Sequence, residues 1–141
     1  MANNKRYLTA FINDSPTIRE AAGTDITNAA HKAVMYNTDG DVVLATDASK
    51  AIGVVLSTAA AEDVGADLIT RAGMQIDILV KYIGLIEVGG VLAKGDPITI
   101  NANGQGVRAA ATDFVFGWAF SNAGAAGELA HVQITRTGKI S

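Results

Sequence analysis

Hydrophobic and polar residues alternate with a period of two over much of the chain, which is typical of β-strands. In the segment 74–82 every second residue is apolar or aromatic: Met74, Ile76, Ile78, Val80 and Tyr82. The residues between them include Gln75, Asp77 and Lys81. Successive side chains of a strand point to opposite faces, so this segment predicts one strand with a core face and a solvent face.

Pairs of Asp or Asn with Gly separate further apolar runs and predict tight hairpin turns. Two such pairs are Asp39-Gly40 and Asn103-Gly104. The apolar runs beside them and later in the chain are Val34–Tyr36, Asp41–Leu44, Pro97–Ile100, Phe114–Phe120 and Leu129–Thr135. No long stretch has the 3.6-residue period of a helix. The pattern therefore predicts an all-β fold, a small barrel or sandwich of short antiparallel strands.

The first residues lack this alternation, and we expect an N-terminal arm over 1–25 and a β-barrel-like domain over 26–141. Ser15-Pro16 followed by Gly23 has the cap, the early proline and the terminating glycine of a short helix. Four apolar residues stand among polar ones before it: Tyr7, Leu8, Phe11 and Ile12. An exposed cluster of this kind predicts contact with another subunit or a partner protein, and a frayed terminus is the alternative.

Two parts of the chain resemble each other, which predicts an internal pseudo-duplication. The four matches, in order, are Gly40-Asp41-Val42 with Gly95-Asp96-Pro97, Ile52-Gly53-Val54 with Phe116-Gly117-Trp118, Ala59–Gly65 with Ala123–Gly127, and Ile69–Gly73 with Ile134–Gly138. In this alignment the second copy is the longer one. Neither half can bury its apolar face alone, so we expect the two halves to close one barrel about a pseudo-twofold axis. Because Trp118 aligns with Val54, the match places Trp118 in the core.

Composition narrows the class of protein. The chain has 141 residues, of which 49% are hydrophobic but only 6% aromatic, so we expect a thin core of small side chains that association would extend. A net charge of −3 gives no basic field, and we expect no nucleic-acid partner. No apolar run is long enough to cross a bilayer and the start lacks a secretion signal, so we expect no membrane partner and synthesis in the cytoplasm. The absence of cysteine excludes disulfides and thiolate metal ligands.

Motifs for catalysis or cofactor binding are incomplete. The oxygen-rich run Asn37–Asp41 has Ala48 at the position where a calcium loop needs Glu. The two histidines, His31 and His131, lie in unrelated contexts and are expected at the surface. Gly138-Lys139 lacks the hydroxyl that a phosphate loop needs, and no serine stands in a Gly-x-Ser-x-Gly elbow. We therefore expect a protein without metal, cofactor or enzymatic activity.

Lys50, within Asp47–Ala51, suggests one alternative. Lipoyl and biotinyl carrier domains also duplicate a β fold and carry a modified lysine at a hairpin tip. The spacing here differs and the chain is much longer than such a domain, so a solvated turn lysine is the preferred interpretation.

Glycine and turn landmarks over 34–137 resemble a known family. They are Asp41–Leu56, Thr58–Gly65, Val88–Ile98, Phe116–Ala119, Ala123–Gly127 and Val132–Ile134. In this order they are similar to the capsid decoration or cement proteins of tailed phages, some of which were once labelled recombinase-like. The longer segment Met1–Gly23 departs from the family pattern.

This resemblance implies a homotrimer on the capsid exterior of the virion, made in the host cytoplasm. It would clamp the major capsid protein against the pressure of packaged DNA, and Tyr7, Leu8, Phe11 and Ile12 would be capsid or subunit contacts. Another virion part, in the tail or a fibre base, is the remaining alternative.

Overall fold

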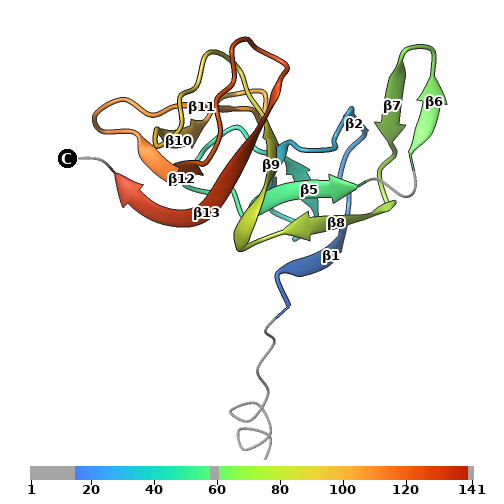
Figure 1. Cartoon of the computed structure of the whole chain (residues 1–141). Coiled ribbons are helices and arrows are strands. Elements are labelled where there is room, and N and C mark those ends of the chain that lie inside the picture. Colours follow the sequence, from blue (N-terminus) through green and yellow to red (C-terminus); the bar gives the residue numbers. More distant parts are fainter. Residues whose placement is uncertain (1–14, 58–60, 140–141) are drawn as a thin grey trace, which may run out of the picture.

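Every regular element of the computed structural model is a β-strand within the described residues, 15–57 and 61–139 (Figure 1). The strands are β1 Thr17–Ala21, β2 Ile26–Thr27, β3 Ala33–Tyr36, β4 Val42–Leu44, β5 Gly53–Ser57, β6 Glu62–Val64, β7 Asp67–Thr70, β8 Gln75–Leu79, β9 Tyr82–Glu87, β10 Pro97–Ile100, β11 Gly106–Arg108, β12 Phe114–Ala119 and β13 Leu129–Lys139. The all-β prediction is confirmed. Among the described residues, no helix is long and apolar enough to span a membrane.

The first five-stranded sheet has the order β1-β8-β5-β3-β4, and all its neighbouring strands are antiparallel. The chain beyond β1 reaches the opposite edge of this sheet, where Ala22 forms a parallel bridge with Val42. The Gly23 N–H donates to the Val42 carbonyl at 2.8 Å. This contact joins the two edges, so the sheet closes into a small barrel.

The second five-stranded sheet has the order β11-β10-β12-β13-β9 and closes in the same way. Val88, just after β9, bridges to Gly106 in β11, and the Gly89 N–H donates to the Gly106 carbonyl at 2.9 Å. Closure leaves few unpaired strand edges in either barrel. The third sheet is a smaller one of order β2-β7-β6.

The two barrels are copies of one arrangement. Each strand of the first has a counterpart at the same place in the second, in the pairs β1 and β9, β8 and β13, β5 and β12, β3 and β10, and β4 and β11. The register also agrees: Val34 pairs with Gly53, and Ile98 with Gly117, each 64 positions later. The predicted pseudo-duplication is therefore present in the fold.

The hairpin turns of the two copies share the same hydrogen bonds. In the first, the Asn37 side-chain oxygen accepts the N–H groups of Asp39 and Asp41, both at 2.9 Å. In the second, Asn101 accepts those of Asn103 and Gln105 at 2.9 and 3.0 Å. An asparagine side chain that bonds the backbone two residues ahead fixes such a turn.

Three of the four sequence matches are out of register with the fold, and that of Gly65 with Gly127 is one of them because Gly127 corresponds to Gly73. Gly40-Asp41-Val42 corresponds to Gly104-Gln105-Gly106, not to Gly95-Asp96-Pro97, since Val42 and Gly106 make the equivalent bridges. Gly73 corresponds to Gly127, because their N–H groups donate to the equivalent Ala22 and Val88 carbonyls. Thr70–Gly73 leads into a turn, whereas Thr135–Gly138 lies within β13, so such short strings recur without structural equivalence.

The longer copy is the first one. The connection from Val55 to its partner Ile78 is ten residues longer than that from Ala119 to Val132, and it contains β6 and β7. The match of Ile52-Gly53-Val54 with Phe116-Gly117-Trp118 is correct. The single shared barrel is wrong, because each half closes through its own bridge.

Two further predictions are corrected by the strand assignment. The short helix after Ser15-Pro16 is instead β1, which pairs with β8 over five residues. The single strand over 74–82 is instead two strands in different barrels, divided at Val80 and Lys81. Tyr82 has a φ of 71°, a turn conformation that alternation of residues does not reveal.

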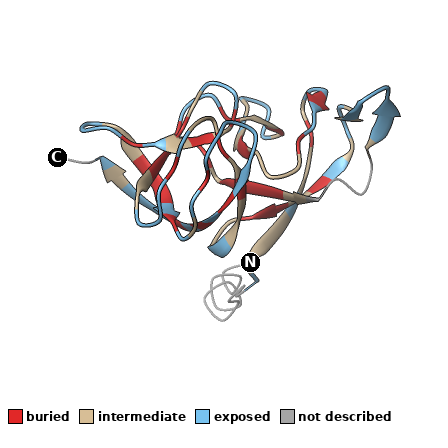
Figure 2. Cartoon of the chain, turned by 45° about the horizontal axis from the view of Figure 1, so that its top comes forward, coloured by how far each residue is buried: buried red, intermediate tan, exposed pale blue. Residues whose placement is uncertain are grey.

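Buried residues, coloured red in Figure 2, belong mainly to two apolar cores. One fills the first barrel and consists of Ala22, Ile26, Ala29, Val34, Val42, Val55, Ile76 and Ile78. The other fills the second barrel and continues into the first through Ala33, Val54 and Leu79. The two barrels are thus packed against each other by an apolar junction.

Candidate interaction surfaces

The outward side of the second sheet carries a row of large exposed side chains. Trp118 pairs with Pro97 on one side and with Gln133 on the other, and Gln133 pairs with Ile83, so all four share one face of the sheet. Phe120 and Leu129 extend the row. The exposed fractions are 38% for Trp118, 46% for Phe120, 48% for Ile83 and 44% for Leu129. We call the six residues of this row the outer face: Ile83, Pro97, Trp118, Phe120, Leu129 and Gln133.

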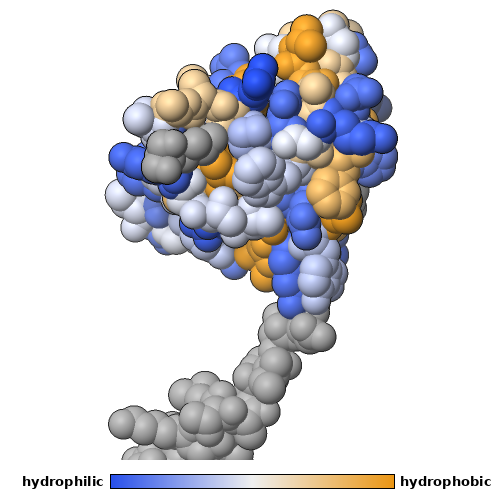
Figure 3. All heavy atoms as spheres, turned by 60° about the vertical axis from the view of Figure 1, so that its left-hand side comes forward, coloured by the Kyte–Doolittle hydropathy of each residue, from blue (hydrophilic) through white to orange (hydrophobic). Residues whose placement is uncertain are grey.

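Trp118 was predicted in the core, and this prediction is wrong. Its counterpart Val54 has an exposed fraction of 0% because the second barrel covers that face of the first. No described segment covers Trp118 in the same way. With the side of the second barrel turned forward, Figure 3 shows hydrophobic side chains among polar ones on the surface. Exposed apolar groups that gather on one face indicate an interaction site.

The β6–β7 hairpin is a second exposed feature and projects from the first barrel (Figure 1). All three residues of β6 are exposed, Val64 at 46%, and Leu68 of β7 is exposed at 45%. Arg71 holds its base by donating to Asp25 at 2.9 Å and to Glu62 at 3.0 Å. The Ala72 N–H and the Arg71 guanidinium, both of which donate to Asp25, lower the pKa of its carboxyl.

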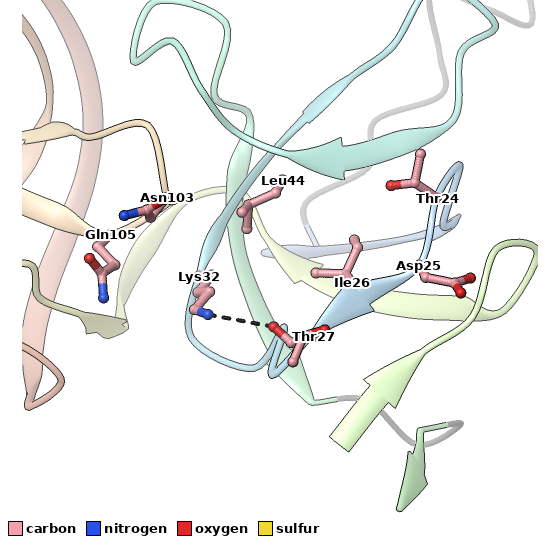
Figure 4. Close-up of a pocket in the computed structure, with 8 residues that line it drawn as sticks. All are labelled: Thr24, Asp25, Ile26, Thr27, Lys32, Leu44, Asn103 and Gln105. Atoms are coloured by element: carbon pink, nitrogen blue, oxygen red, sulfur yellow. Dashed lines mark hydrogen bonds between the residues drawn. The ribbon is translucent and has the colours of Figure 1, made fainter. Parts of the chain in front are cut away.

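A polar hollow of about 430 Å³ lies between the barrels (Figure 4). Lys32 from the first half donates to the Thr27 carbonyl at 3.5 Å and lies 3.9 Å from the Glu87 carboxylate of the second half. Gln105 donates to the same carboxylate at 2.8 Å. These groups brace the junction between the two halves.

The remaining sequence candidates are turn or surface residues. Asp47 accepts the N–H and hydroxyl of Ser49 at 2.9 and 2.8 Å, which lowers the pKa of its carboxyl and places Lys50 in an exposed turn. His131 is exposed as predicted, whereas His31 is half-buried with a φ of 67°. Within 15–57 and 61–139, no three His, Cys, Asp or Glu residues gather as metal ligands. The contact candidates Tyr7, Leu8, Phe11 and Ile12 lie outside the described residues.

Comparison with known proteins decides the class. A family model described as structural cement protein (E217 gp24/Pam3 gp6) matches residues 9–135. The chain belongs to this family of phage cement proteins. It is therefore a structural component of a phage virion rather than an enzyme, as the resemblance implied. No curated protein matches the chain significantly.

The fold of this cement protein is similar to a solved structure, the head fiber gp8.5 N base in bacteriophage phi29. The TM-score is 0.64 at 18% sequence identity, over 89% of this chain and 97% of the other. At this identity the likeness concerns the fold.

Sequence reasoning missed the outer face as a set. Trp118 and Phe120 lie in the apolar run Phe114–Phe120, and the alignment of Trp118 with Val54 was interpreted as a core position. Ile83 and Leu129 join the face only through strand pairing, which the sequence does not show.

Proposed function

We propose that this cement protein binds the outside of the phage head as a homotrimer and contacts the major capsid protein. In doing so it stabilises the shell against the pressure of packaged DNA. The outer face is the observation that supports this best, since Trp118, Phe120, Ile83 and Leu129 are 38–48% exposed on a barrel whose own core is complete. Such a face gains stability when another protein covers it.

Multiple weak contacts explain how an inert barrel can hold a lattice together. A trimer offers three copies of one contact, and after the first has formed the others bind at a high effective concentration, which raises avidity by about 10²–10⁴. A ligand that binds only the assembled shell stabilises that state by mass action. No chemical step is required.

A head-binding experiment tests this function. Purified full-length protein is mixed with expanded heads that lack decoration, and bound protein is measured after sedimentation, with light scattering of the free protein for its mass. We expect saturable binding and heads that resist heat or osmotic shock better than bare ones. A monomer that does not sediment with heads would contradict the proposal, and unexpanded heads serve as a control for lattice specificity.

The base of a fibre is the second candidate, because the similar solved structure is a head fiber base. In that role the barrels would attach a fibre to the head. Immunogold labelling of virions separates the two roles: labels spread over the shell favour a cement protein, whereas labels confined to a fibre or the tail favour this alternative.

A further inference from the structure

Equivalent faces of the two barrels differ in burial: the face of the first barrel is covered, whereas that of the second is exposed. In the first barrel, the face that corresponds to the outer face carries Val54 and Leu79, with exposed fractions of 0% and 6%. It packs on Gly84 in β9, where an added Cβ would lie 2.3 Å from Leu79 Cδ2 and 3.9 Å from Val54 Cγ2. The first barrel therefore presents this face and the β9 edge of the second barrel receives it.

A hairpin turn completes the junction. The second barrel's turn at Gly104 rests on Leu44, because a Cβ at Gly104 would lie 2.7 Å from Leu44 Cδ1. The Ala33 N–H donates to the Gly104 carbonyl at 2.8 Å. The receiving surface thus consists of an edge strand and the adjacent hairpin turn.

The duplication identifies the equivalent groups that this junction leaves unused. On the presenting side, the second-barrel residues equivalent to Val54, Leu79 and Leu44 in strand register are Trp118, Gln133 and Arg108. On the receiving side, the first-barrel residues equivalent to Gly84 and Gly104 are Ile18 and Gly40. Among the described residues, each chain therefore has one presenting face at its second barrel and one receiving surface at its first that the internal junction leaves uncovered.

The substituted groups are complementary in charge. Where Leu44 meets Gly104 inside the chain, the equivalent pair is Arg108 and Gly40, and Gly40 is flanked by Asp39 and Asp41. The Arg108 side chain is 72% exposed and lies 3.8 Å from Asp96, which leaves its guanidinium able to meet further carboxylates. Opposite charges at matched positions favour a specific partner.

We propose that a second copy of this chain covers the outer face, with its β1 edge and its Asp39–Asp41 turn placed as β9 and the Gly104 turn are placed on the first barrel. The contact is head-to-tail, so it joins two different surfaces, and the proposed homotrimer requires that its rotation close after three copies. The inference rests on the proposed homotrimer and gives it an interface. In a trimer, six barrels would alternate around the ring.

The substitutions also make this contact weaker than the internal junction. Pro97 is the second-barrel equivalent of Ala33, whose N–H donates to the Gly104 carbonyl in the internal junction. Proline has no N–H, so this hydrogen bond is missing between copies. Ile18 fills the space that Gly84 leaves open for Leu79. A junction between copies that is looser than the one within a chain fits a subunit that folds first and assembles afterwards.

Charge reversal tests the interface in the full chain. Arg108→Glu and Asp39→Lys each place like charges across it, and we expect the dissociation constant of the oligomer to rise roughly tenfold or more in sedimentation velocity. The double variant restores opposite charges, and we expect its dissociation constant to return close to that of the unmodified chain. Lys94→Glu and Asp63→Lys are matched controls, exposed residues outside the interface, and should change little.

The outcomes separate the two proposals. Association unaffected by either single reversal, or no rescue in the double variant, overturns the head-to-tail interface while the homotrimer stands. A symmetric dimer that is disrupted by Trp118→Glu but by neither charge reversal also overturns it, in favour of face-to-face pairing. A monomeric unmodified chain instead contradicts the homotrimer itself. Thermal unfolding of each variant shows whether the barrels remain folded.

Discussion

Matched glycines allow the strands of each barrel to approach closely. An added Cβ at Gly53 would lie 2.1 Å from the Leu79 carbonyl oxygen, and one at Gly117 would lie 2.3 Å from that of Gln133. Gly23 and Gly89 form a second pair, with Asn37 and Asn101 Nδ2 each 2.6 Å away. Any side chain at Gly53 or Gly117 must move backbone, so these two glycines are required by the packing of the strands.

We predict that Gly117→Ala lowers the free energy of unfolding by about 3 kcal/mol, since overpacking against backbone cannot be relieved by a rotamer change. Gly53→Ala should have a similar effect in the first barrel. Gly90→Ala is the control, because no atom lies within 4 Å of its Cβ position and its φ is not positive. Chemical denaturation measures all three, and a loss at Gly117 no larger than at Gly90 would contradict the close approach.

Trp118 supplies a direct probe because it is the one tryptophan of the chain. If a second copy or the head covers the outer face, its emission should shift to shorter wavelength and acrylamide should quench it less. We expect both changes on raising protein concentration through the association range. Phe120→Ser on the same face should weaken them, whereas Val91→Ser, at a residue 74% exposed outside the face, should not. Unchanged quenching on assembly would place the interface elsewhere.

Among elements, the β6–β7 hairpin differs most from its surroundings, since it has no counterpart in the second copy and little apolar burial. Its base depends on Asp25, which accepts from the Arg71 guanidinium and from the Ala72 N–H, both at 2.9 Å. The hairpin should therefore open more readily than the barrels.

This arrangement predicts a dependence on pH. The pKa of Asp25 is lowered in the folded state, so its stabilising contribution is present above the unfolded value of about 4 and is lost as pH falls through the folded pKa. The rate of amide hydrogen exchange in β6 and β7, divided by the rate in β12, should increase as pH falls below about 4. Asp25→Asn keeps an acceptor for Ala72 but removes the charge, and should abolish most of this dependence. A hairpin equally protected throughout would contradict the role of Asp25.

The duplication also predicts that the hairpin is dispensable for folding. Removing ten residues between Val55 and Gly73 gives the first copy a connection as long as that between Ala119 and Gly127. We expect a folded chain with a modestly lower melting temperature, since the Thr70 and Leu68 contacts to β2 and Asn28 are lost. Loss of cooperative unfolding would show instead that the third sheet supports the first barrel.

At the level of elements, local patterns predicted what local chemistry determines. The Asp39-Gly40 and Asn103-Gly104 hairpins form because asparagine bonds and positive-φ glycines act over a few residues. The division at Lys81 was missed, since alternation continues through it. Closure of each sheet by Ala22 and Val88 is a long-range contact with no local signature.

For the whole molecule, the sequence revealed the duplication and matched Gly53 with Gly117 correctly, although the other matches were out of register. One shared barrel was predicted because neither half was expected to bury its apolar face alone, and the match with Val54 placed Trp118 in the core. Two closed barrels bury only one of the two equivalent faces, and this asymmetry exposes Trp118. The candidate surface thus follows from how the two barrels pack on each other, which local residue patterns leave open.

The N-terminal residues provide the last test at this scale. Tyr7, Leu8, Phe11 and Ile12 remain proposed contacts to the capsid or a neighbouring subunit. β1 begins at Thr17 and β1 pairs fully with β8, so the first barrel contains its strands without residues 1–14. We predict that deletion of 1–14 leaves the melting temperature nearly unchanged but weakens retention on heads in sedimentation.

Replacing the four apolar residues by serine keeps the length and charge of the segment and isolates their hydrophobic contribution. If this variant binds heads as weakly as the deletion, contact by apolar side chains accounts for the loss, because burying each releases roughly 1.5–3 kcal/mol. If it binds like the unmodified chain while the deletion does not, the backbone or polar groups of the segment make the contact. If either change unfolds the first barrel, these residues belong to its core, and other surfaces of the two barrels must account for attachment.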